Sequence, residues 1–177
     1  MRNFYVWMEA FSKLQVQKAN SAYDKHGFCS SIPLEDSLSI ILRFLQKHPK
    51  SKVLDYGAGK DPVLTKWLKS KGYDVAAHDF GKNQTDDHDD KALNSKYDLV
   101  IAINVLNVQQ DKSMLNKALE QIKDALKHNG LLIATFPKFP NETGMGSQEF
   151  KKVFKLHFAI VKFKNLKSGG IIAKAKV

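Results

Sequence analysis

Hydrophobic residues recur at helical spacing over the first fifty residues. A stripe that starts at Phe4 predicts an amphipathic helix over residues 3–22. A second stripe, from Leu34 to Leu45, predicts a helix that tolerates Pro33 near its start and ends at His48. We therefore expect residues 1–50 to form a helical N-terminal segment.

From residue 51 onward, short apolar runs alternate with helical patterns. The runs predict buried strands at Val53–Leu54, Tyr73–Phe80, Tyr97–Ile103 and Leu131–Phe136. Residues 81–96 separate the second run from the third, and because they are polar they predict a loop. Three β–α steps in succession predict an α/β fold with a doubly wound parallel sheet and right-handed crossovers over residues 51–137.

Two helices are expected between these strands. For the first, Asp61 is the expected N-cap, Pro62 the first helical residue and Gly72 the C′ residue. Its expected apolar stripe consists of Val63, Leu64, Trp67 and Leu68. The second helix carries a stripe from Leu115 to Leu126, and residues 128–130 are expected to end it.

The last part of the chain, residues 138–177, follows another pattern. Phe150, Val153 and Phe154 predict a short helix. The segments Phe158–Phe163 and Ile171–Lys176 then predict two strands of an antiparallel hairpin. With no internal repeat or linker, the 177 residues are expected to form a single domain.

Composition adds a few limits. The hydrophobic content of 43% is enough for a core and argues against disorder. A single cysteine, Cys29, excludes an intrachain disulfide and a cysteine-based zinc site. No apolar stretch approaches the roughly 20 residues that span a bilayer, and the N-terminus has no signal-peptide pattern. We expect a cytoplasmic protein that does not enter the membrane.

Charge is distributed unevenly along a chain with a net charge of +10. Residues 138–177 contain nine lysines and two glutamates, whereas residues 79–98 contain six aspartates and three lysines. A basic tail is typical of nucleic-acid binding, although it also increases solubility. Nucleic acid is therefore open as a partner of the C-terminal region.

The strongest candidate site follows the first strand. Asp55-Tyr56-Gly57-Ala58-Gly59 comes at the end of this strand, and Asp79 comes at the end of the next. Ligands of open α/β sheets bind beyond the carboxyl ends of the strands, where glycines permit close approach and a carboxylate binds ribose hydroxyls. The motif therefore predicts a nucleotide-like ligand.

The acidic residues in and after the motif favour some nucleotide-like ligands over others. A dinucleotide fingerprint requires a third glycine where this chain has Pro62, and a pyrophosphate would disfavour the acids Asp55 and Asp61. S-adenosylmethionine has a sulfonium, an ammonium and a ribose, so it suits these charges. We expect it as the cofactor.

At these positions the chain resembles the class I S-adenosylmethionine-dependent methyltransferases. The segments that carry the resemblance are Val53–Gly59, Asp79, Tyr97–Val108 and Leu126–Ile133. The resemblance implies a Rossmann-like, mostly parallel sheet with a C-terminal antiparallel hairpin. It also implies a cofactor site made of Asp55, Tyr56, Gly57, Ala58, Gly59, Asp79, Phe80, Asn104 and Val105. The segment Val105-Leu106-Asn107-Val108 is similar to one in small bacterial and phage-borne methyltransferases.

Some features depart from that family. Its third strand is hard to place, and Asp86 or Asp87 is the candidate for its adenine-contacting acid. Asn104 is not followed by the Pro-Pro-aromatic motif of amino-group methyltransferases, so that mechanism of base methylation is not supported. No catalytic base is identified. His78 is expected to pack rather than catalyse, and the acidic run around His88 is expected to be solvated rather than to bind a metal.

Three functions are compared. The leading one is a methyltransferase that transfers the methyl group by in-line displacement to an unidentified acceptor, nucleic acid or another anion included. The alternative is a non-catalytic module on the same fold that binds nucleic acid or a partner, recognised by salt-dependent binding without cofactor affinity. The third is an NAD-type oxidoreductase, which a retained nicotinamide would reveal. The sequence does not predict the oligomeric state.

Overall fold

The computed structural model describes residues 31–137, 141–165 and 170–177, so the helix expected over residues 3–22 lies outside the described residues. The helices are α2 (Ser31–Lys47), α3 (Val63–Ser70), α4 (Lys112–Ala125) and α5 (Ser147–His157). The strands are β1 (Lys52–Tyr56), β2 (Asp74–His78), β3 (Tyr97–Ala102), β4 (Leu126–Phe136), β5 (Ile160–Asn165) and β6 (Ile171–Lys176). Three short 3₁₀ helices are η1 (Gly81–Asn83), η2 (Ala92–Asn94) and η3 (Leu106–Val108).

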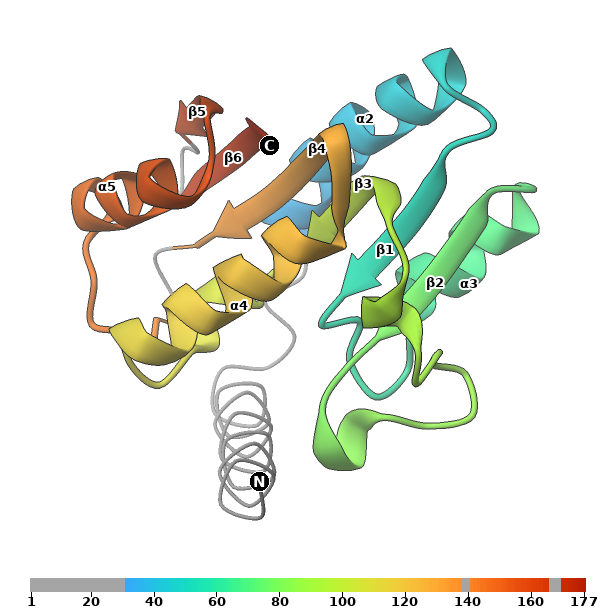
Figure 1. Cartoon of the computed structure of the whole chain (residues 1–177), viewed down its shortest axis with the longest axis horizontal. Helices are drawn as coiled ribbons and strands as arrows, with labels where there is room; N and C mark the ends of the chain where they lie inside the picture. The colour runs from blue at the N-terminus through green and yellow to red at the C-terminus, as the bar shows by residue number, and fades with distance from the viewer. Residues whose placement is uncertain (1–30, 138–140, 166–169) are drawn as a thin grey trace.

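The strands form one sheet in the order β2-β1-β3-β4-β6-β5 (Figure 1). The first four strands in this order are parallel, and β6 is antiparallel to both of its neighbours. The predicted α/β fold, with a mostly parallel sheet and a C-terminal antiparallel pair, is confirmed. The chain proceeds from β1 to β2 on one side and then crosses to β3 on the other, so the topological switch point lies at the carboxyl ends of β1 and β3.

Helices cover both faces of the sheet (Figure 1). On one face α2 and α3 pack Ile41, Leu45 and Leu68 against strand residues such as Val53 and Ile101. On the other face lie α4 and α5, which contribute Leu119, Ile122, Phe150 and Phe154 to a larger core with Leu54 and Val100. Successive strand residues point to opposite faces. The continuous apolar runs of β1, β3 and β4 follow from this, because both faces are buried.

Helix α3 differs from its prediction. It begins at Val63 with Pro62 as its N-cap, and the Asp61 side chain forms an ion pair with Lys66 at 2.9 Å instead of capping the helix. Val63 is 64% exposed and Trp67 is 36% exposed, so half of the expected stripe faces solvent. The buried positions are Thr65 and Leu68, and the Thr65 hydroxyl donates a hydrogen bond of 2.8 Å to Asp55 of β1.

The expected end of α4 at residues 128–130 is also wrong. The helix ends at Ala125, and Leu126 already pairs with Tyr97 in the sheet. The register then shifts, so that Leu99 pairs with Leu131. Gly130 lies in this bulge, where an added Cβ would be 2.9 Å from the Lys127 carbonyl oxygen. The close approach of the backbone therefore explains the glycine, which the sequence suggested as a helix terminator.

The other expected elements agree with the structure. Residues 81–96 form an irregular loop that includes η1 and η2, and within the described residues no strand pairs with the free edge of β2. Gly72, with φ +86°, follows the last turn of α3 as predicted. None of the described helices is long and apolar enough to cross a membrane.

Candidate functional site

Residues 57–59, called here the glycine loop, leave β1 at the carboxyl edge of the sheet. Gly57 and Gly59 have φ angles of +74° and +78°, a region that favours glycine. The N–H groups of Gly57 and Ala58 both donate to the His78 carbonyl, at 2.8 and 3.0 Å. The loop therefore turns toward the end of β2, where the sequence places its second candidate acid.

That acid, Asp79, binds the glycine loop directly. One carboxylate oxygen accepts the N–H of Gly59 at 2.6 Å, and the other accepts the N–H of Phe80 at 2.7 Å. Asp79 is only 6% exposed, and burial raises the pKa of its carboxyl although these hydrogen bonds oppose the rise. The Asn83 side chain also donates to this carboxylate. The two oxygens have about four lone-pair sites in all, so Asp79 keeps acceptor capacity for a ligand hydroxyl.

Asp55 is the second buried carboxylate of the site. It is 4% exposed and accepts a hydrogen bond of 2.8 Å from the hydroxyl of Thr65 on α3. Burial raises the pKa of Asp55 to about 6, and the nearby charge of Asp79 contributes to this rise. Two carboxylates at one edge of the sheet favour a ligand that carries positive charge.

The segment after β3 contacts the glycine loop. An added Cβ at Gly57 would lie 2.4 Å from Cγ2 of Val105, so these two predicted site residues are in direct contact. Asn104 has φ +57°, and its N–H donates to the Thr135 hydroxyl at 2.8 Å. The Thr135 hydroxyl in turn lies 3.3 Å from the side-chain oxygen of Asn104. These contacts connect the ends of β1, β3 and β4.

Aromatic side chains fill the space below the site. Tyr56 is fully buried and its hydroxyl donates to Gln121 of α4 at 2.7 Å, so Tyr56 offers only its backbone to a ligand. Phe80 is half-buried, with its ring centroid 4.8 Å from that of His78 and 5.6 Å from that of Tyr56. The buried His78 ring makes no hydrogen bond to the described residues, and burial lowers its pKa to about 4. His78 is a neutral packing residue, as predicted.

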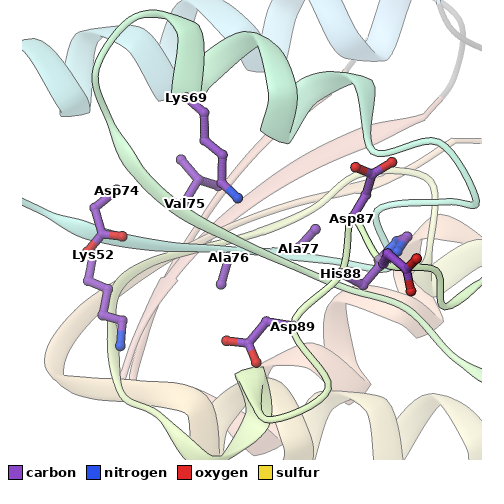
Figure 2. A pocket seen from close by; sticks show the side chains of 10 residues that line it. Lys52, Lys69, Asp74, Val75, Ala76, Ala77, Asp87, His88 and Asp89 are labelled. Carbon is purple, nitrogen blue, oxygen red and sulfur yellow. The ribbon is translucent and has the colours of Figure 1, made fainter.

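The acids after β2 line a cavity of about 430 Å³ beside the free edge of that strand (Figure 2). Lys52 and Asp74 lie at one end of the cavity, and Asp87 and His88 lie at the other. Asp87 also forms an ion pair of 2.8 Å with Lys66. Within the part of the chain that the structure describes, no group of three or more His, Cys, Asp or Glu side chains is arranged to hold a metal ion.

Two residues that the sequence did not assign to the site contribute to it. Thr65 donates to Asp55, and His88 lies 2.9 Å from the carbonyl oxygen of Gly59. Both contacts join segments that only the tertiary fold brings together. The structure thus unites Asp55, the glycine loop, Asp79 and Val105 at one edge of the sheet.

The chain matches the model of a known protein family, and its fold is similar to several solved structures. A family model described as a methyltransferase domain matches residues 28–148. Among solved structures, the chain is similar to the PH0226 protein from Pyrococcus horikoshii OT3, with a TM-score of 0.62 and 14% identity over 80% of this chain and 88% of that one. A comparison with curated proteins found no significant match.

Two further structures are similar at the level of the fold. A TehB-like SAM-dependent methyltransferase from Corynebacterium glutamicum has a TM-score of 0.59 and 17% identity, covering 94% of this chain and 98% of that one. A SAM-dependent methyltransferase from Bacteroides fragilis, solved in complex with S-adenosylhomocysteine, has a TM-score of 0.58 and 12% identity. It covers 72% of this chain and 73% of that chain. At these identities the likeness shows a shared fold.

The contact with Val105 distinguishes the two glycines of the loop. We predict that Gly59→Ala lowers the free energy of unfolding by about 1 kcal/mol, since it adds only backbone strain. Gly57→Ala also forces a side chain into Val105, and we expect a loss of about 3 kcal/mol in urea unfolding. Adding Val105→Ala to Gly57→Ala should give a smaller total loss than the sum of the two single changes. Equal losses at the two glycines would contradict the contact.

The buried charge of Asp55 should reduce stability. Because burial raises the pKa of Asp55 from its ordinary value of 3.8 to about 6, the folded state retains a proton that the unfolded state releases between about pH 4 and 6. Stability therefore falls over this range and the loss persists at higher pH. We predict that Asp55→Asn, which keeps an acceptor for Thr65, raises the free energy of unfolding at pH 7 by about 2–3 kcal/mol. Urea unfolding of both proteins from pH 4 to 8 measures this, and parallel pH profiles would refute it.

Proposed function

The chain belongs to the methyltransferase domain family, and on this premise we propose that it binds S-adenosylmethionine at the carboxyl edge of the sheet and transfers the methyl group to an anionic acceptor. The observation that carries the proposal is the pair of buried carboxylates, Asp55 and Asp79, on either side of the glycine loop. The finer likeness to small bacterial and phage-borne methyltransferases stays a prediction.

The residues at this edge fit the parts of the cofactor. Asp79 retains acceptor capacity for ribose hydroxyls, and Asp55 supplies negative charge for the ammonium and sulfonium end. The absence of a side chain at Gly59, whose Cβ position has no described group within 4 Å, lets the backbone approach the ligand closely. Phe80 offers an aromatic face at the end of β2.

The chemistry requires little from the protein beyond placement. When bound, S-adenosylmethionine supplies a methyl group on a positively charged sulfur: the acceptor attacks the methyl carbon in line, and the sulfur leaves as a neutral thioether. The chain positions the two reactants and excludes water, which is the main source of rate enhancement for such a step. The neutral, packed His78 is not suited to act as a base, and we assign no catalytic base.

The basic tail supports an anionic acceptor, and nucleic acid is the macromolecule that fits it best. Lys162 and Lys164 are exposed on β5, the outermost strand of the sheet. Ile171 of β6 pairs with Asn165 at the end of β5 and also with Phe136 at the carboxyl end of β4. The ends of β5 and β4 therefore lie at the same level of the sheet. The register therefore places positive charge at the edge of the sheet that holds the glycine loop.

Asp79 provides the test of the cofactor site. We predict that Asp79→Ala weakens S-adenosylmethionine binding about tenfold to a hundredfold, because hydrogen bonds to a charged group are lost. The matched control is Asp90→Ala, an exposed aspartate of the following loop, which should bind like the parent. Isothermal titration calorimetry measures both, with thermal unfolding to show that the variants are folded. Unchanged affinity in Asp79→Ala would refute the site.

The acceptor class is tested by salt dependence. We predict that single-stranded and duplex DNA or RNA bind with affinity that falls steeply with salt, and that Lys162→Gln with Lys164→Gln reduces the logarithmic slope by about 2. The control pair is Lys47→Gln with Lys50→Gln. These exposed lysines lie at the end of α2 and just before β1, near the amino ends of the strands, and the substitutions should leave the slope unchanged. Salt-independent or absent binding contradicts a nucleic-acid acceptor, and binding without cofactor affinity favours a non-catalytic module.

A further inference from the structure

His88 lies in the loop between β2 and β3, in the acidic run beside the free edge of β2 (Figure 2). Its Nε2 atom is 2.9 Å from the carbonyl oxygen of Gly59, although the two residues are 29 positions apart in the chain. The contact joins this loop to the second glycine of the cofactor motif.

The neighbours of His88 determine which ring nitrogen carries the proton. The backbone N–H of Thr85 can only donate, and it points to Nδ1 of His88 at 3.1 Å. Nδ1 is therefore the acceptor, and Nε2 carries the proton that it donates to Gly59. The Thr85 hydroxyl also lies 3.1 Å from Nδ1.

Backbone bonds hold the histidine in place. The N–H of His88 donates to the Thr85 carbonyl at 2.9 Å, which closes a turn. The next residue, Asp89, donates its N–H to the Ala77 carbonyl of β2 at 2.9 Å. On the other side, Asp87 binds Lys66 of α3. The turn is thus connected to β2 and to α3, the helix that follows the glycine loop.

We propose that His88 is a positioning residue for the cofactor site, acting through Gly59. Asp79 accepts the N–H of Gly59 and His88 donates to its carbonyl, so the two peptide groups that flank this glycine are both held. Among the described residues, none lies within 4 Å of the position that a Gly59 side chain would take, so hydrogen bonds rather than side-chain packing hold this end of the loop. Holding it before the ligand arrives reduces the ordering cost of binding. This inference rests on the proposed function.

The test compares two substitutions of the histidine in titrations with S-adenosylhomocysteine. His88→Ala removes the donor, and we expect about tenfold weaker binding. His88→Gln retains an N–H donor near the position of Nε2, and we expect affinity within about threefold of the parent. Asp90→Ala, in the same loop and exposed, is the control and should bind like the parent. A residue with only a structural role would lower the unfolding temperature in His88→Ala and leave the affinity for S-adenosylhomocysteine unchanged.

The outcomes separate this inference from the proposed function. If the parent protein does not bind S-adenosylhomocysteine, the proposed function fails. If the parent binds and His88→Ala binds equally well, or glutamine restores nothing, the role of His88 is refuted. A ¹⁵N spectrum of the free protein gives an answer independent of binding: we expect a proton on Nε2 of His88, and the Nδ1-protonated form would overturn the proposal.

Discussion

The hydrogen bond between the Asp79 carboxylate and the N–H of Gly59 is the interaction on which the rest of the site depends. It joins the end of β2 to the turn that leaves β1, two segments that meet only because parallel strands terminate at the same edge of the sheet. Burial of the carboxylate makes this bond costly to form, and the N–H groups of Gly59 and Phe80 offset that cost. The same buried acceptor is what a ribose requires. The Asp79 side chain therefore both connects β2 to the glycine loop and supplies the acceptor for a ligand hydroxyl.

A site of this kind needs a stable frame around it. Asp55 is a carboxylate in a desolvated position, so its charged form is unfavourable by itself. The loop that follows has positive φ angles at Gly57 and Gly59, which glycine adopts without steric cost. The frame is the sheet with one apolar core on each face, which fixes the ends of β1 and β3. Val105 then packs against Gly57, and Thr65 on α3 binds Asp55. Helix α3 faces the sheet through Thr65 and Leu68, while Val63 is exposed to solvent.

The sequence was sufficient for features that depend on local pattern. Continuous apolar runs predicted the strands, because each run is a short stretch of the chain. The positions of the Asp55–Gly59 motif and of Asp79 after successive strands indicated that they meet at one edge of the sheet, and Asp79 does accept a hydrogen bond from Gly59. It failed where tertiary contacts decide. The early end of α4 follows from pairing of Leu126 with Tyr97, which helical periodicity does not reveal. His88 resembled part of a solvated acidic run, since no local signal shows that its ring reaches Gly59.

The loop after β2 completes this arrangement. Residues 81–96 run past the end of β2 with little regular structure, yet they return to the glycine loop through His88 and to β2 through Asp89. A crystal structure of the protein with S-adenosylhomocysteine tests the central claim most directly. The account predicts ribose hydroxyls within hydrogen-bond distance of the Asp79 carboxylate, with the glycine loop in the conformation described above. A ligand bound elsewhere, or no ligand at millimolar concentration, would contradict it.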